Sequence, residues 1–301
     1  MIQKTIFFLL LYAVISSCHS RKGKLAQADL DVIDSLELAA NLQVSEEAID
    51  EIIQSVSSPV EMAALIKEIG TPFSMDYLAT TDYVDRYNTS SQMAFSLGIF
   101  GADLGYLNIY KNNVQIVDYL MAINQLANGI RVGHFFDFVR LNQLATSREG
   151  IDSLMYISVS SFNNIDSYLR ENNRGHLSAL MITGVWIECL YLATRVASET
   201  SNPLLNERIG EQKLNLHNLL LILNPYKDQK PIADLLTQLD EVKEVFDQVE
   251  ITYEIGVPET VEKNGMVMIL QNEKSIVKLT DEQLQKIINK TEEVRNKLIA
   301  I

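Results

Sequence analysis

The sequence predicts a mainly α-helical protein: an antiparallel helical array or bundle, with a small C-terminal β-hairpin or three-stranded sheet and a closing helix. Three observations predict it. Proline and glycine are sparse, with 6 and 13 among 301 residues, and both destabilise helix interiors. Apolar residues recur at helical spacing between short polar turns, as in antiparallel helices. After residue 248 the pattern changes to strict alternation, which is typical of a half-buried strand.

Helix-start and helix-stop residues divide the body of the chain into predicted helices. The segment 58–61 supplies a serine N-cap, a proline in the first turn and a capping-box glutamate, and Gly70 ends that helix. Thr89 and Gln92 form a second capping box. The other predicted helices cover 49–56, 93–110, 113–127, 149–170, 176–199, 203–223 and 231–248.

The C-terminal part predicts strands followed by one helix. Residues 249–255 alternate apolar and polar side chains, and 266–270 with 275–279 are predicted to form a hairpin around 272–274. Thr280 begins the closing helix with another capping box. Because so small a sheet is not stable alone, we expect it to pack on the helical body.

The first eighteen residues have the order of a lipoprotein signal. Lys4 precedes ten apolar residues at 6–15, a run too short to span a membrane but long enough for a signal-peptide core. Ile15-Ser16-Ser17-Cys18 resembles the lipobox of bacterial lipoproteins, in which cleavage precedes a cysteine that is then acylated. Ordinary secretion after Ser17, or a plain N-terminal core helix, are the alternatives. The lipoprotein interpretation is favoured because position, apolar length and cysteine agree.

The predicted organisation has four parts: a signal peptide at 1–17, a lipidated Cys18 with a tether at 18–30, a helical domain at 31–248, and a β element with its closing helix at 249–301, packed on the helical domain. Cleavage leaves 284 of the 301 residues and changes the net charge from −14 to −15, because Lys4 is the one charged residue lost. So acidic a body excludes a general nucleic-acid-binding surface. The membrane, reached through Cys18, is the predicted partner. The basic residues within 21–24 either meet anionic headgroups or lie in a solvated tether.

Local catalytic and metal-binding signatures are missing from the sequence. It contains no HExxH, CxxC, GxSxG, P-loop or EF-hand pattern. Cys189 lies in an apolar stretch and is predicted to be a buried, inert thiol. His134, His176 and His217 do not have metal-ligand spacing. We therefore expect no cofactor and no metal site.

Two further features favour packing over ligand binding. Gly98, Gly101 and Gly105 share one helix face, where missing side chains let another backbone, or alternatively a ligand or partner, approach closely. The segment 71–88 is aromatic, interrupted by proline and poorly periodic. It is predicted to be a loop that packs on the bundle or contacts a partner.

Asp103 and Glu188 are the weak catalytic candidates, because each falls inside an otherwise apolar predicted helix. A buried carboxylate needs a partner or a raised pKa. Tyr106 and Tyr191, three residues further on, are candidate neighbours and belong to a weak repeat at an offset of 85 residues. If the helices face each other, the acids could share a proton or bind a metal, although the Glu-x-x-His pairs of di-iron bundles do not occur. Structural acids that bond to tyrosines, arginines or helix ends are favoured.

Over most of its mature length the chain resembles the helical lipoproteins common in Bacteroidetes. Besides the lipobox, the resemblance lies in 101–106, 119–120, 208–214 and 280–284. The resemblance brings no established activity and no catalytic residue. Surface-exported lipoproteins of that group carry acidic residues soon after the cysteine. This chain has His19-Ser20-Arg21-Lys22 there, which favours the periplasmic face of the outer membrane.

These features predict a membrane-anchored cell-envelope lipoprotein that acts as a non-enzymatic binding or scaffold protein for an envelope protein or small ligand. The alternative is an envelope enzyme or metal-binding protein that uses Asp103 and Glu188, with His134 or His176 as further ligands.

Overall fold

The structure is a computed structural model that describes residues 59–300, except 147–150, 256–258, 264–265 and 271–272. The chain divides into two compact units, Met1–Asn41 and Leu42–Ile301, and every described residue belongs to the second. The predicted signal peptide, Cys18, the tether at 18–30 and the helix predicted at 49–56 all lie outside the described residues.

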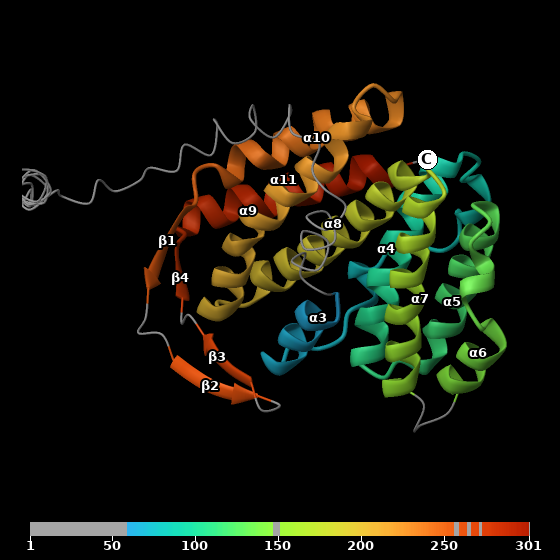
Figure 1. Cartoon of the computed structure of the whole chain (residues 1–301), viewed down its shortest axis with the longest axis horizontal. Coiled ribbons are helices and arrows are strands. Elements are labelled where there is room, and N and C mark those ends of the chain that lie inside the picture. The colour runs from blue at the N-terminus through green and yellow to red at the C-terminus, as the bar shows by residue number, and fades with distance from the viewer. Residues whose placement is uncertain (1–58, 147–150, 256–258, 264–265, 271–272, 301) are drawn as a thin grey trace, which may run out of the picture. The chain divides into compact units, whose positions relative to one another are not determined.

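The described part of the chain is mainly α-helical and ends in a β-ribbon and a closing helix, as the sequence predicts (Figure 1). Its α-helices are α3 (Pro59–Glu68), α4 (Ser90–Ile109), α5 (Asn113–Gly129), α6 (Phe138–Thr146), α7 (Ile151–Glu171), α8 (Gly175–Glu199), α9 (Pro203–Leu223), α10 (Lys230–Phe246) and α11 (Asp281–Ile299). The strands between α10 and α11 are β1 (Glu250–Ile255), β2 (Glu259–Lys263), β3 (Met266–Leu270) and β4 (Glu273–Lys278).

Two of the three predicted capping boxes lie within the described residues, and both form; Ser58, the N-cap of the third, lies outside them. Thr89 and Thr280 each make a full capping box, at the start of α4 and α11 respectively. The helix α6 is not among the sequence predictions. Its signal is Asp137, whose side chain accepts a hydrogen bond from the Arg140 backbone N–H at 3.0 Å, the geometry of an N-cap.

The hairpin predicted between 266–270 and 275–279 is wrong. Instead, β1 pairs antiparallel with β4, and β2 pairs antiparallel with β3. Figure 1 shows the β2–β3 pair following on from the β1–β4 pair. The two residues between β2 and β3, at 264–265, are Asn-Gly, the dipeptide most typical of a two-residue hairpin.

The β1–β4 pair packs on α9. The Val277 side chain covers Gly210, and the Ser275 hydroxyl donates a hydrogen bond to Glu211 at 2.6 Å. The ammonium group of Lys213 donates to the Val249 carbonyl at 2.7 Å. Tyr253, which the alternation places on the buried face of its strand, is 52% exposed. The helical body covers the beginning of β1 and not this position.

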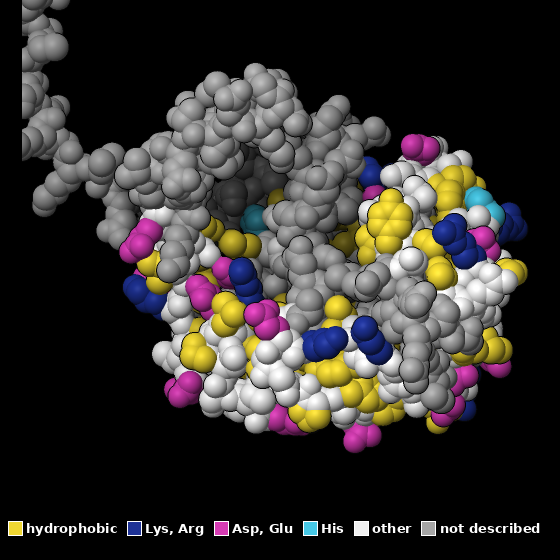
Figure 2. Space-filling view, turned by 90° about the horizontal axis from the view of Figure 1, so that it is seen from below, with side chains coloured by type: hydrophobic (Ala, Val, Ile, Leu, Met, Phe, Trp, Pro, Cys, Tyr) yellow, Lys and Arg dark blue, Asp and Glu magenta, His cyan; other side chains and the backbone are white. Residues whose placement is uncertain are grey.

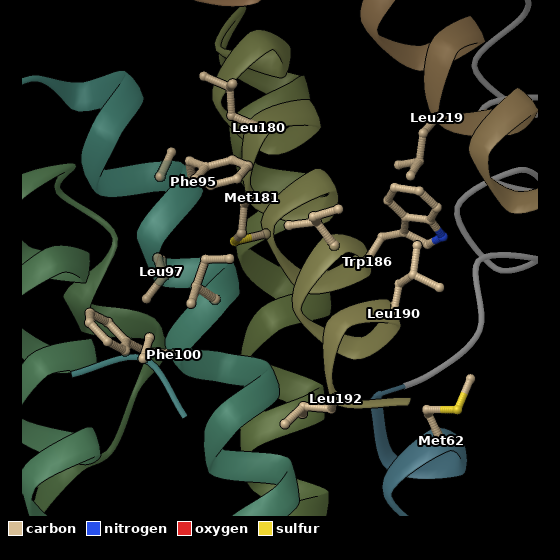
Figure 3. Close-up of a cluster of buried hydrophobic side chains, with 14 of the residues drawn as sticks. Met62, Phe95, Leu97, Phe100, Leu180, Met181, Trp186, Leu190, Leu192 and Leu219 are labelled. Atoms are coloured by element: carbon tan, nitrogen blue, oxygen red, sulfur yellow. The ribbon is translucent and has the colours of Figure 1, made fainter. Parts of the chain in front are cut away.

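The core is built around the contact of α4 with α8, whose side chains interleave with one another and reach α9 through Trp186 and Leu219 (Figure 3). A Cβ on Gly98 would overlap the Met181 backbone carbonyl, and one on Gly184 would overlap the Phe95 carbonyl. The two helix backbones therefore touch at these glycines, which confirms the packing interpretation for Gly98. In contrast, Gly101 faces the ring of Phe162 on α7.

The helix α8 is long and apolar enough to cross a membrane by length and composition, the one such helix among the described residues. However, 89% of its most apolar window is buried within the fold. Core helices of proteins outside membranes meet the same criterion, so α8 is weak evidence for a membrane span.

Among the described helices, three end with a non-glycine residue in the left-handed conformation. Lys111 after α4, Arg131 after α5 and Asn173 after α7 have φ values of 55°, 62° and 56°. In each case the next backbone N–H donates to a carbonyl five residues back, as in a Schellman motif. Glycine adopts this conformation without the steric cost of a Cβ atom.

Replacing Lys111 with glycine is expected to stabilise the protein by about 1 kcal/mol, because it removes this steric cost at an exposed position. Urea unfolding of the full-length chain measures the change. Lys111→Ala is the matched control, since it removes the same side chain but keeps the Cβ. An equal gain in both variants would show that the long side chain, and not the backbone conformation, carries the cost.

Candidate functional site

The contact between α4 and α8 brings the two candidate acids together. Asp103 of α4 and Glu188 of α8 both have 0% of their surface exposed. Each lies a few residues C-terminal to the glycine of its own helix at the Gly98–Gly184 contact. The two carboxylates are close enough for the charge of Glu188 to act on Asp103. The condition set by the sequence, that the two helices face each other, is met.

Glu188 is paired with an arginine from the closing helix. The Nε and Nη2 atoms of Arg295 donate to the two Glu188 oxygens at 2.8 and 2.6 Å. Arg295 is itself 5% exposed, and such two-pronged pairs are strong and directional. Burial alone would lower the pKa of Arg295, but the Glu188 carboxylate raises it above its ordinary value. The prediction of an arginine partner is confirmed for Glu188.

Asp103 binds the segment 71–88, which we call the strap. Its Oδ2 accepts a hydrogen bond from the Ala79 backbone N–H at 3.1 Å. The Tyr119 hydroxyl donates to the Ala79 carbonyl at 2.6 Å, so both backbone groups of this strap residue are bound. Burial, and secondly the charge of Glu188, raise the Asp103 pKa well above its usual range.

The second oxygen of Asp103, Oδ1, is buried and has no hydrogen-bond donor among the described residues. Buried polar atoms without partners are rare and costly in folded proteins. The unpaired Oδ1 atom is therefore an unusual feature of the site.

The two tyrosines of the repeated pattern bind the same segments as their neighbouring acids. The Tyr106 hydroxyl accepts a hydrogen bond from the Ser74 backbone N–H of the strap at 3.1 Å. The guanidinium of Arg295 lies over the Tyr191 ring, 4.3 Å from its centre, within the range of a cation–π contact. The Asp103–Tyr106 pair thus holds the strap, and the Glu188–Tyr191 pair holds α11.

Aromatic side chains of the strap complete its attachment. Phe73 stacks on Tyr106 with ring centres 5.5 Å apart, and the Tyr110 hydroxyl donates to the Thr71 carbonyl at 2.7 Å. Tyr77 is buried, whereas Tyr83 is exposed. The strap packs on the bundle in both halves, because Val84 and Tyr87 also lie against the core.

The histidines are not brought to the carboxylate pair. His134 contacts the rings of Phe135 and Tyr168, and His176 contacts Tyr226. Burial, then Lys243, lowers the pKa of His217. Within the described ranges, no three His, Cys, Asp or Glu side chains are placed to hold a metal ion.

Cys189 is buried beside the cluster, as the sequence predicts. Burial, and then the charges of Glu188 and Asp103, raise its thiol pKa. A thiol in this environment is a poor nucleophile, because the thiolate is the reactive form.

Sequence reasoning did not identify Arg295 or the role of Ala79. Arg295 lies on the same face of the closing helix as Leu284, Ile288, Thr291 and Leu298. A charged residue on this mostly apolar face was the signal in the sequence that could have identified it. Ala79 has no such signal, because only its backbone takes part.

Comparison with protein-family models, with curated protein sequences and with solved structures gave no match.

Replacing Arg295 with methionine is expected to destabilise the protein by about 3–5 kcal/mol, because the Glu188 carboxylate is left buried without its cation. Chemical unfolding of the full-length chain measures the loss. Adding Glu188→Gln to Arg295→Met should restore most of it. The matched control is Lys297→Met, which breaks exposed ion pairs on the same helix and should cost less than about 1 kcal/mol. Equal losses at both positions would contradict the importance of the buried pair.

Proposed function

We propose that this chain is a lipid-anchored lipoprotein of the bacterial cell envelope, whose helical body binds an envelope protein or small ligand without catalysing a reaction. The observation that carries the anchor is the Ile15–Cys18 lipobox directly after the apolar run at 6–15. The resemblance to lipoproteins of Bacteroidetes supports the same assignment. The residues at 19–22 favour the periplasmic face of the outer membrane.

The physical consequence of the anchor is durable membrane attachment. One acyl chain binds a membrane only marginally, at about 0.8 kcal/mol per buried CH₂ group, and stable anchoring takes two or more chains. Lipoproteins of the kind that the lipobox resembles carry three. The basic residues within 21–24 can add about 1 kcal/mol each on an anionic surface.

The geometry of the carboxylate pair supports binding over catalysis. A substrate or metal would have to reach two carboxylates with 0% exposure and displace Arg295 from both oxygens of Glu188. The interactions that satisfy Glu188 come from within the protein. The enzyme or metal-binding alternative would therefore require the core to open.

The surface offers contact area of the kind that partners use. Met121 on α5, Val139 on α6 and Tyr156 on α7 are large apolar side chains that are exposed. Figure 2 shows apolar, acidic and basic side chains intermixed over the described part of one face. Protein interfaces combine apolar contact with polar surroundings in this way.

Changing Cys18 to serine is expected to abolish both fatty-acid labelling and membrane association, because the serine cannot carry the lipoprotein modification. Metabolic labelling with a clickable fatty acid, followed by membrane fractionation, measures both. Cys189→Ser is the matched control, since that thiol is buried and should leave labelling unchanged. A Cys18→Ser protein that kept its label and its membrane fraction would contradict the anchor.

A binding function is expected to leave a discrete partner attached after crosslinking in intact cells. A photoreactive amino acid at exposed Tyr156 should yield one specific adduct by mass spectrometry. The same residue placed at exposed Tyr253, on β1, controls for general proximity. Recovery of only abundant envelope proteins from both positions would count against the binding proposal.

A further inference from the structure

The polar cluster in the core contains more negative than positive groups. Two carboxylates, Asp103 and Glu188, meet one guanidinium, that of Arg295. All three are buried, and an uncompensated charge in such a place is very unfavourable. One proton on the pair would make the cluster neutral.

The orphaned oxygen of Asp103 points to where that proton lies. Ionised carboxylates contain only acceptors. Asp103 and Glu188 are within side-chain hydrogen-bonding reach of each other, yet Oδ1 of Asp103 has no donor. A bond between the two acids exists only if one of them carries a proton. Both oxygens of Glu188 already accept a hydrogen bond from Arg295, so the oxygen left for the proton is Oδ1 of Asp103.

We propose that Asp103 and Glu188 share one proton, carried by Asp103, and that this proton couples the docking of the strap to the docking of α11. Asp103 holds the strap through Ala79, and Glu188 holds α11 through Arg295. Loss of the proton places two like charges side by side in a buried site, and water reaches them only if the strap or α11 is released. The proton thus links Ala79 to Arg295, which are 216 residues apart in the sequence.

The tyrosine and cysteine side chains around the pair do not change this charge balance at neutral pH. Tyr119 from α5, and Cys189 and Tyr191 from α8, all have pKa values raised mainly by burial, so they stay neutral. The other charged groups that act on the cluster's members are Asp118 of α5, Arg195 of α8 and Glu292 of α11. Arg195 and Glu292 are paired with each other at 3.3 Å.

The raised pKa of Asp103 sets the sign of the pH dependence. Its stabilising proton is bound in the folded state but released on unfolding above the ordinary aspartate pKa, so stability from this group falls as pH rises. The unfolding equilibrium constant should rise by roughly tenfold per pH unit from this one proton.

Asp103→Asn is the decisive variant, because an asparagine reproduces the protonated acid. Its amide oxygen can accept from Ala79, and its amide nitrogen can donate to Glu188. In full-length protein between about pH 5 and pH 7, the ratio of the wild-type to the variant unfolding constant should rise by roughly tenfold per pH unit. Parallel pH profiles, or an Asp103→Asn protein that fails to fold, would overturn the proposal. Asp166→Asn is the matched control, because it makes the same substitution at another buried aspartate, one that is paired with Arg170 and lies outside the cluster.

Two spectroscopic readouts test the proton and the coupling directly. Infrared spectra at neutral pH should contain a protonated-carboxyl band that Asp103→Asn removes, and its absence from the wild type would refute the shared proton. Hydrogen exchange, corrected for intrinsic rates, should accelerate at Ala79 and in α11 together as pH rises, in the wild type but not in Asp103→Asn. Acceleration of one segment alone would refute the coupling.

Discussion

The close approach of α4 and α8 at Gly98 and Gly184 is the constraint on which the rest of the fold depends. With no Cβ atoms at these positions, backbone meets backbone. At 1.5 Å of rise per residue, Asp103 and Glu188 lie about 6–8 Å beyond the glycines along their helices. The contact that closes the core therefore also places two carboxylates in one buried space, and the structure must then neutralise them.

The two carboxylates determine where the strap and α11 attach. Arg295 compensates Glu188 only if α11 lies against α8, and Asp103 finds a donor only if the strap crosses α4 at Ala79. Each attachment is reinforced by the tyrosine three residues after the acid. The acid-x-x-tyrosine pattern looks like a weak repeat in the sequence. In both places it attaches a distant segment: Asp103 and Tyr106 bind the strap, and Glu188 and Tyr191 bind α11.

Features whose interacting residues lie close together in the sequence could be predicted from it, and features with distant partners could not. Caps such as Thr89 and Thr280 are readable because the cap and its partner are three residues apart. Asp103 and Glu188 stand out because an acid in an apolar helix is unusual whatever its partner. The partner itself is not readable: Arg295 is 107 residues from Glu188, and Ala79 acts through a backbone group that every residue has. The strand pairing was missed for a different reason, since the Asn-Gly dipeptide at 264–265 was available in the sequence as a hairpin signal.

A buried ion pair is not needed for stability alone, because well-packed apolar side chains of similar volume often do as well or better. What an apolar contact does not supply is direction. A leucine at position 295 would pack against α8 in several registers. The Arg295 fork, in contrast, meets both oxygens of Glu188 and lies over Tyr191 in one register, because a shift of one residue turns a helical side chain by about 100°. The same holds for the strap, whose poorly periodic sequence has no apolar stripe. Besides its aromatic contacts, it is fixed through backbone groups at Thr71, Ser74 and Ala79. The polar cluster therefore adds directional contacts to the apolar packing of α11 and the strap, and these contacts define one position for each.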